Sequence, residues 1–349
     1  MAMGTRAERL MASGNRPITY LRLSVTDRCN LRCRYCMPAG GVPLLPPGEL
    51  LSLEELIRVV RCLAQMGVTK VRVTGGEPLV RRGVVGLVRA LAELPGIAEV
   101  VMTTNGLLLS RYASQLAAAG LKRLNLSLDT LVPERYRQIT RGGSLPRFWE
   151  GVEAARAAGF EQLRFNCVVI RGFNDDELGR LAALTRDHPW QVRFIEYMPI
   201  GSAPGGPEWP AGYLPYSEIY ETVLHQLARE LALDLSELLE RWEPVPTPPA
   251  ATARVYRVRG FAGTIGFISP LGQHFCGGCN RLRLTADGRL HACLLAAGTV
   301  DLKPLLRQGT TDAQLRAALR QAARLKPAHH GLAPAAAVHT PKIMSRLGG

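Results

Sequence analysis

The chain has 349 residues, 47% of them hydrophobic, and a formal net charge of +14. It is long enough to bury one large core or two modest ones, so we expect a globular protein. It contains no run of about eighteen apolar residues and no apolar signal segment at its start, which excludes a membrane span and predicts a location in the cytoplasm.

Six extended segments alternate with helical ones between residues 18 and 199. The extended segments are "ITYLRLSV", "KVRVTGG", "EVVMTTNG", "RLNLSLD", "QLRFNCVVI" and "QVRFIEYMP". The helical segments have apolar periodicity, and the first has a capping box at Ser52 and Glu55 and a terminal Gly67. Six β-then-α units predict an α/β fold, a partial (βα)6 TIM-like barrel spanning residues 1–200.

The alternation stops after about residue 200, and a second region, residues 201–349, follows. A loop rich in Pro and Gly precedes a helical stretch from Ser217 to about Trp242, a Pro-rich linker "EPVPTPP", a predicted hairpin and a helix near residues 312–325. Residues 224–242 have the periodicity of an amphipathic surface helix, which we interpret as an embellishment or a partner contact. We expect this C-terminal extension to cover the open side of the barrel.

Three of the eight cysteines, Cys29, Cys33 and Cys36, directly follow the first extended segment in "CNLRCRYCMP". A structural zinc site needs four ligands, and no nearby His or Cys supplies the fourth. An iron–sulfur cube held by three cysteines leaves one iron open to another ligand. The spacing therefore predicts an open catalytic metal site. Cys62 and Cys167 stand alone, and we interpret them as small buried apolar side chains.

Polar motifs end the next three extended segments: "TGGEP", "TTNG" and "SLD". Because active sites of α/β barrels gather at the carboxyl ends of the strands, we expect these motifs to surround the cysteine loop. The glycines of "TGGEP" allow a backbone to approach a ligand closely.

A second group, Cys276, Cys279 and Cys293, has the spacing C-x2-C-x13-C. His274 and His291 flank it and are candidates to complete a zinc site. From spacing alone zinc and iron–sulfur stay open, but a second three-cysteine site beside the first favours a second cluster.

Basic residues outnumber acidic ones, 43 to 29, which indicates either a nucleic-acid surface or a pocket for a polyanion. Aromatic residues, which nucleic-acid surfaces use for stacking, are sparse. Several arginines stand in extended segments, as in "LRLS", "VRVTGG", "LRFN" and "NRLRL". This placement favours an internal anion pocket over binding of nucleic acid.

The first cysteine loop resembles that of the radical S-adenosylmethionine (SAM) superfamily. From "LRLSVTDRCNLRCRYCMP" through "RFIEYMP" and "FCGGCNRLRLTADG" to the terminal "GG", the sequence is similar to the GTP 3',8-cyclases of molybdenum cofactor biosynthesis. The resemblance implies two 4Fe–4S clusters and SAM. It also implies a 5'-deoxyadenosyl radical that takes the ribose 3' hydrogen of GTP, leading to (8S)-3',8-cyclo-7,8-dihydroguanosine 5'-triphosphate.

The resemblance also implies roles for individual residues. The SAM contacts it implies are Tyr35, Gly76, Glu77, Ser127 and Met198. The GTP contacts it implies are Arg22, Arg72, Thr103, Arg164, Arg281 and Arg283. Arg164 stands where the family often has lysine, which changes the hydrogen-bond geometry. The terminal Gly348 and Gly349 would reach into the active site, where the family needs them for radical formation.

The partners implied by the resemblance are GTP, an electron donor such as flavodoxin or ferredoxin, and the next enzyme, cyclic pyranopterin monophosphate synthase. It also implies a homodimer. Two alternatives remain at this point: a peptide-modifying radical SAM enzyme with an auxiliary cluster, and a zinc-containing nucleic-acid-binding module.

Overall fold

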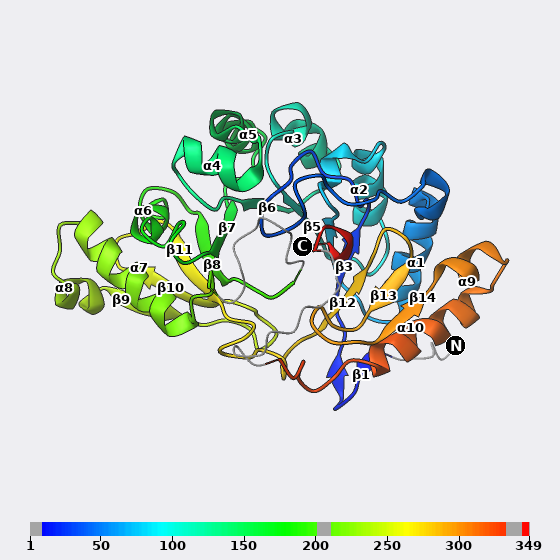
Figure 1. Ribbon diagram of the computed structural model, residues 1–349. Helices are drawn as coiled ribbons and strands as arrows, with labels where there is room; N and C mark the ends of the chain where they lie inside the picture. Colours follow the sequence, from blue (N-terminus) through cyan, green and yellow to red (C-terminus); the bar gives the residue numbers. More distant parts are fainter. Residues whose placement is uncertain (1–8, 201–210, 333–343, 349) are drawn as a thin grey trace.

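The computed structural model describes residues 9–200, 211–332 and 344–348. Its main feature is a curved sheet with six parallel strands at its centre, in the order β3-β4-β5-β6-β7-β8 (Figure 1). These are the six predicted extended segments: β3 (Tyr20–Ser24), β4 (Lys70–Thr74), β5 (Glu99–Thr104), β6 (Arg123–Ser127), β7 (Arg164–Val169) and β8 (Gln191–Glu196). The predicted partial barrel is therefore confirmed.

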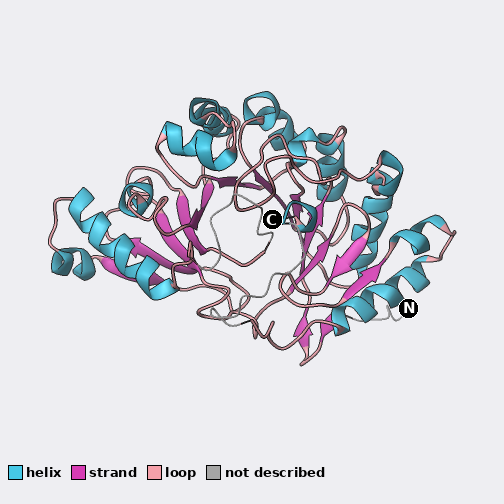
Figure 2. Ribbon diagram, viewed as in Figure 1, coloured by secondary structure: helices cyan, strands magenta, loops and turns pink. Residues whose placement is uncertain are grey.

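Helices cover the outer, convex side of this sheet (Figure 2). They are α1 (Leu53–Gln65), α2 (Val84–Ala92), α3 (Leu109–Ala118), α4 (Pro133–Thr140), α5 (Leu145–Ala157) and α6 (Leu178–Ala183). The predicted capping box starts α1, since Ser52 Oγ accepts from the Glu55 N–H and Glu55 accepts from the Ser52 N–H. Among the described helices, none is long and apolar enough to cross a membrane.

The C-terminal region adds one parallel strand to each edge of the central sheet. β11 (Thr264–Ile268) pairs with β8, and β12 (Arg281–Leu284) pairs with β3. Antiparallel strands follow outward on each side: β10 (Arg254–Val258) and β9 (Trp242–Val245), then β13 (Arg289–His291) and β14 (Thr299–Asp301). The antiparallel pairing of β10 with β11 confirms the predicted hairpin. The extension was expected to cover the open side of the barrel, and it also adds strands to both edges of the barrel sheet.

Several further elements lie outside this sheet and the helices that cover it. A short antiparallel pair, β1 (Met11–Ala12) and β2 (Arg16–Pro17), precedes the barrel. The helices α9 (Lys303–Arg307) and α10 (Asp312–Arg324) follow β14, and α10 matches the helix predicted near residues 312–325. The last helix, α11 (Met344–Leu347), lies at the carboxyl ends of the central strands (Figure 1).

The helical stretch predicted from Ser217 to about Trp242 is confirmed in most of its length, but it is interrupted after Glu230 and ends at Glu240. The structure has two helices, α7 (Tyr216–Glu230) and α8 (Leu235–Glu240), because Ala232 takes a left-handed φ of 52° and Asp234 caps α8. Trp242 begins the edge strand β9, which takes in the start of the predicted Pro-rich linker. Proline is tolerated there because an edge strand need not donate every N–H. Since α7 packs on α6, it belongs to the helical layer. The interpretation of residues 224–242 as an embellishment or a partner contact stays a prediction.

Candidate active site

The first cysteine group lies in the loop that follows β3, at the carboxyl ends of the strands. Cys29, Cys33 and Cys36 all line one cavity, whose empty volume out to its mouth is about 1250 Å³. The "TGGEP", "TTNG" and "SLD" motifs all contribute residues to the same cavity, as their positions at the strand ends predicted.

The five residues expected to contact SAM share this cavity with the cysteines. They are Tyr35, Gly76, Glu77, Ser127 and Met198. The Tyr35 hydroxyl donates to Asp129 Oδ2 at 2.8 Å, and the Val168 N–H donates to the other oxygen at 2.9 Å. Gly76 allows the loop after β4 to meet the cysteine loop, since a Cβ there would lie 2.2 Å from the Arg28 carbonyl oxygen. Sequence reasoning missed the bracing role of Asp129.

Glu77 braces the wall of the cavity. Its carboxylate accepts from the Thr104 hydroxyl at 2.7 Å, the Asn105 N–H at 2.8 Å and the Leu79 N–H at 3.0 Å. Burial raises the pKa of Glu77 to about 7, although these three hydrogen bonds oppose the shift. Both carboxylate oxygens therefore hold the loop after β5 in place, a contact that the motif did not reveal.

The three cysteine side chains fit a multi-iron cluster better than one ion. Among the described residues, only His274, Cys276 and His330 bring three potential ligand atoms within 4.8 Å of one another. The sulfurs of Cys29, Cys33 and Cys36 are therefore more widely spread than the ligands of a single zinc. Burial raises the pKa of Cys29 to about 11 and of Cys36 to about 12, so cluster binding must displace protons from these thiols.

A cluster of cations fills the barrel interior below this cavity. Arg22 and Arg72 are neighbours across β3 and β4, and Arg283 flanks Arg22 on β12. Arg72 is buried, and its Nη1 donates to Thr103 Oγ1 at 3.1 Å. Arg164, on β7, has its pKa lowered to about 10, first by burial and then by Arg123 and Arg72. The arginines expected to contact GTP are therefore gathered in one space.

The structure adds Arg193 of β8 to this cation cluster. Its side chain is 7% exposed, and its Nε has no hydrogen-bond partner. Gly266 on the neighbouring β11 makes room for it, because a Cβ there would lie 3.0 Å from Arg193 Cγ. Asn125 Oδ1 and Asn166 Oδ1 are also buried without partners. Such orphaned polar atoms indicate a polar ligand. The sequence contained a signal for this residue: Arg193 in "VRFIE" stands between apolar strand residues, as Arg72 does in "VRVTG".

Two members of the second cysteine group, Cys276 and Cys279, lie in the loop between β11 and β12, and Cys293 follows β13. Burial would raise the pKa of the Cys279 thiol, but Arg281 and Lys326 outweigh burial and lower it to about 6. Lys326 is itself buried, and its Nζ donates to the Arg281 and Ala292 carbonyl oxygens at 2.8 Å. Arg281 Nη2 lies 3.6 Å from Cys279 Sγ. Cys276 and Cys293 lie close enough to interact electrostatically, so the three thiols share one charged environment.

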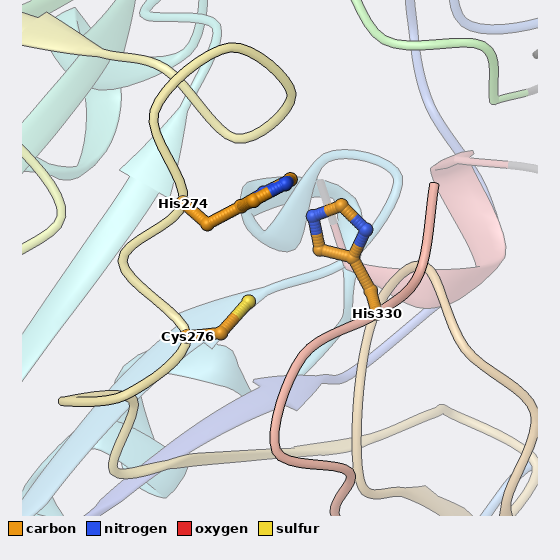
Figure 3. Close-up of side chains that lie close together, drawn as sticks. All are labelled: His274, Cys276 and His330. Carbon is orange, nitrogen blue, oxygen red and sulfur yellow. The ribbon is translucent and has the colours of Figure 1, made fainter. Parts of the chain in front are cut away.

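Of the two histidines proposed to complete a zinc site, only His274 lies beside Cys276. Its partner is His330, which sequence reasoning missed because it lies far along the chain (Figure 3). His291 is buried on β13, with its Nδ1 2.9 Å from Thr299 Oγ1. Both ring nitrogens of His330 have backbone partners, the Pro270 carbonyl and the Leu332 N–H. A zinc ion on this trio would have to break one of these bonds.

The end of the chain reaches into the same site. Arg22 Nη2 donates to the Gly348 carbonyl oxygen at 3.0 Å, and Arg283 Nη1 does so at 3.2 Å. Gly348 has a φ of 72° and packs against Ser24 and Thr74. Gly349 lies outside the described residues. Two arginines expected to contact GTP therefore hold the tail.

Comparison with known proteins decides the family. A family model described as "Radical SAM superfamily" matches residues 23–185, and one described as "Molybdenum Cofactor Synthesis C" matches residues 190–332. The chain is 46% identical to a GTP 3',8-cyclase of Moorella thermoacetica, covering 96% of this chain and 98% of that protein. It is 47% identical to that of Pelotomaculum thermopropionicum, with 96% and 98% covered. The chain belongs to the GTP 3',8-cyclase family.

A solved structure supports the fold independently. The crystal structure of Streptococcus suis SuiB bound to S-adenosylmethionine has a TM-score of 0.53 to this chain at 16% identity, covering 87% of this chain and 68% of SuiB. At that identity the likeness shows the radical SAM fold alone. Membership in the superfamily supports a 4Fe–4S cluster and SAM as cofactors of this chain.

Membership in the GTP 3',8-cyclase family also decides between the alternatives. The peptide-modifying radical SAM enzyme and the zinc-containing nucleic-acid module are not favoured, because relatives across nearly the full chain are GTP 3',8-cyclases. The barrel arginines, which a peptide-modifying enzyme would leave without a purpose, suit a nucleotide triphosphate.

Proposed function

We propose that this chain is a GTP 3',8-cyclase, a radical SAM lyase that converts GTP into (8S)-3',8-cyclo-7,8-dihydroguanosine 5'-triphosphate. This is an early step of molybdenum cofactor biosynthesis. The observation that carries the proposal is the arrangement of three groups of residues: a cavity lined by three cysteines, a cation cluster on the barrel strands, and a second cysteine group around β12, the strand that pairs with β3.

The residues of the SAM cavity position the cofactor. Cys29, Cys33 and Cys36 would hold one 4Fe–4S cluster, which with SAM supplies the 5'-deoxyadenosyl radical when both are bound. Gly76 lets the loop after β4 lie against the cysteine loop, and the Tyr35–Asp129 hydrogen bond fixes the ring of Tyr35 at the cavity wall. Ser127 and Met198 line the same space and complete the proposed SAM contacts.

The barrel arginines bind the triphosphate in this proposal. Guanidinium forks suit phosphate oxygens, and a triphosphate needs several fixed cations. Arg22, Arg72, Arg164, Arg281 and Arg283 supply them, with Thr103 held beside Arg72. Arg193 joins this set on the evidence of its unpartnered Nε. Cys276, Cys279 and Cys293 would hold the second 4Fe–4S cluster.

The tail links the two halves of the site. Since Arg22 and Arg283 both hold the Gly348 carbonyl, the position of the tail depends on the same guanidinium groups that are proposed to meet GTP. We propose that Gly348, with Gly349 after it, keeps these groups in order while SAM is cleaved.

Metal analysis of the chain after anaerobic reconstitution is expected to give about eight irons per chain, because each of the two cubes contains four. The Cys276→Ser variant should retain about four, since the first cluster does not share ligands with the second. One zinc per chain in place of the second four irons would contradict the two-cluster proposal.

GTP, SAM and a strong reductant should together yield 5'-deoxyadenosine and the cyclised nucleotide. The matched control is ATP, which has the same triphosphate but a different base. Equal turnover with ATP would overturn the guanine assignment and leave the radical chemistry standing.

The Arg193→Met variant should bind GTP about 10- to 100-fold more weakly, because a buried charge-assisted hydrogen bond to phosphate is lost. Equilibrium binding without SAM or reductant measures this, and iron content should not change. The control is Arg257→Met, an exposed arginine on β10. Unchanged affinity in Arg193→Met would remove Arg193 from the proposed site.

The remaining partners follow from the chemistry. We propose that a reduced flavodoxin or ferredoxin delivers the electron, that cyclic pyranopterin monophosphate synthase takes the product, and that the chain acts as a homodimer. A cytoplasmic location suits two clusters held by reduced thiols. Gel filtration of the reconstituted protein tests the dimer, since a monomer at all concentrations would contradict it.

A further inference from the structure

Tyr20 stands at the start of β3, on the inner side of the barrel, and the established site residues do not include it. Its phenol oxygen accepts a hydrogen bond from Arg72 Nε. Lys70 Nζ lies 5.3 Å from the centre of its ring and the Arg72 guanidinium carbon lies 5.9 Å from it. The hydroxyl therefore faces the cation cluster at close range.

Positive charge is in excess around this hydroxyl. The cations that interact with it electrostatically come from β3, β4, β7, β8 and β12: Arg22, Lys70, Arg72, Arg164, Arg193 and Arg283. Arg281 is the register partner of Tyr20 on β12. The facing carboxylate is Glu99 of β5, which already pairs with Lys70 at 2.5 Å and with Arg123.

The buried cations oppose one another. Burial and then Arg283 hold the pKa of Arg22 well below its usual range, and burial and then Arg72 do the same for Arg193. A pocket with this much like charge needs an anion to stay in its closed geometry. A bound triphosphate would provide this anion. Before the nucleotide binds, a group of the protein itself must supply the negative charge.

We propose that Tyr20 is the built-in counter-anion of the pocket: its phenolate balances the cations while the pocket holds no nucleotide, and it takes up one proton from solvent when a triphosphate binds. This inference rests on the proposed binding of a nucleoside triphosphate to the barrel arginines. The step moves one proton and no electrons.

The local electrostatics give the direction of the proton transfer. Burial alone would raise the pKa of Tyr20, but Arg72, Arg22 and Lys70 outweigh burial and lower it to about 7. A triphosphate neutralises those cations and adds negative charge beside the phenolate, so the pKa must rise on binding. At pH 8 the free protein then holds Tyr20 largely as the phenolate, and binding draws in a proton.

Both forms of Tyr20 accept the Nε–H of Arg72, so the guanidinium stays directed at Thr103 in either state. Tyr20 is therefore a positioning residue for Arg72. Because binding consumes a proton, the contribution of Tyr20 weakens GTP affinity as the pH rises above 7, by up to tenfold per pH unit.

Calorimetry on the reconstituted holoenzyme tests the proposal. GTP is titrated anaerobically at pH 8, without SAM or reductant, in buffers of different ionisation enthalpy. The wild type should take up more protons than Tyr20→Phe, by up to one for each GTP bound. The matched control is Tyr112→Phe, whose ring lies 5.4 Å from the Arg111 guanidinium carbon on α3, and it should behave like the wild type.

Equal proton uptake by the wild type and Tyr20→Phe would overturn the proposal. Should Tyr20→Phe fail to fold, ultraviolet resonance Raman of the wild type at pH 8 decides, since a tyrosinate band must be present in the free enzyme and decrease with GTP. Its absence in the free enzyme also overturns the proposal. Inorganic tripolyphosphate is a second probe. If proton uptake accompanied binding of tripolyphosphate but not of GTP, the proposed function would be contradicted, whereas the role of Tyr20 as counter-anion would be supported.

Discussion

The Cys33→Ala variant is expected to lose SAM cleavage completely and to retain about four irons per chain. Cys33 is one of the three proposed ligands, and burial and then Cys36 raise the pKa of its thiol well above the usual range. Two remaining thiols cannot anchor a cube against exchange with solvent. Iron analysis and the yield of 5'-deoxyadenosine measure the two effects.

The matched control for this variant is Cys62→Ala. Cys62 is fully buried on the inner face of α1 and lies in a different part of the core from the cavity. Its replacement should cost about 1 kcal/mol of stability through a small cavity and leave about eight irons and full activity. SAM cleavage at the wild-type rate by Cys33→Ala would show that the first cysteine loop does not hold the catalytic cluster.

The Gly348→Ala variant is expected to reduce SAM cleavage at least tenfold while iron content stays unchanged. A Cβ at this position would lie 2.3 Å from Thr74 Oγ1, and the φ of 72° already disfavours a side chain. The tail must therefore move, and its carbonyl leaves Arg22 and Arg283. Single-turnover formation of 5'-deoxyadenosine in the presence of GTP measures the loss.

Gly309→Ala separates backbone strain from the clash. Gly309 has a φ of 70°, and a Cβ there would meet nothing within 4 Å. It therefore carries the same strain, about 1 kcal/mol, without a displaced tail. If Gly348→Ala and Gly309→Ala both cleaved SAM at the wild-type rate, the packing of the tail against Thr74 would have no part in the reaction.

The central strands were predictable because each is short, apolar and followed by a polar motif, and periodicity is a local signal. The grouping of the SAM residues was predictable for the same reason, since parallel strands bring their carboxyl ends to one edge. Two residues expected to contact GTP also come from separate motifs and meet: Arg72 Nη1 lies 3.1 Å from Thr103 Oγ1. The residue roles taken from the family, and the domain boundary near residue 200, stay predictions.

The features that were missed depend on contacts between distant residues. No local pattern shows that β12 pairs with β3, because the two segments are separated by more than half the chain and their register is set by packing. His330 follows α10, more than fifty residues after Cys276, so no local spacing links the two. The break between α7 and α8 depends on the left-handed φ of a single residue, Ala232. The bracing of Glu77 and Asp129 depends on main-chain donors of neighbouring loops, which carry no residue signature.

The pairing of β12 with β3 and of β11 with β8 sets the order in which the enzyme can be assembled during synthesis. When the ribosome has released the first six strands, β3 and β8 still present unpaired edges, which are sites of aggregation. The strands that cover both edges arrive only with residues 264–284. Such late, long-range pairing is slow to form, so the edges of the nascent barrel stay exposed until these strands are made. A chain halted before them would lack the strands that cover both edges and two of the proposed GTP-binding arginines, Arg281 and Arg283.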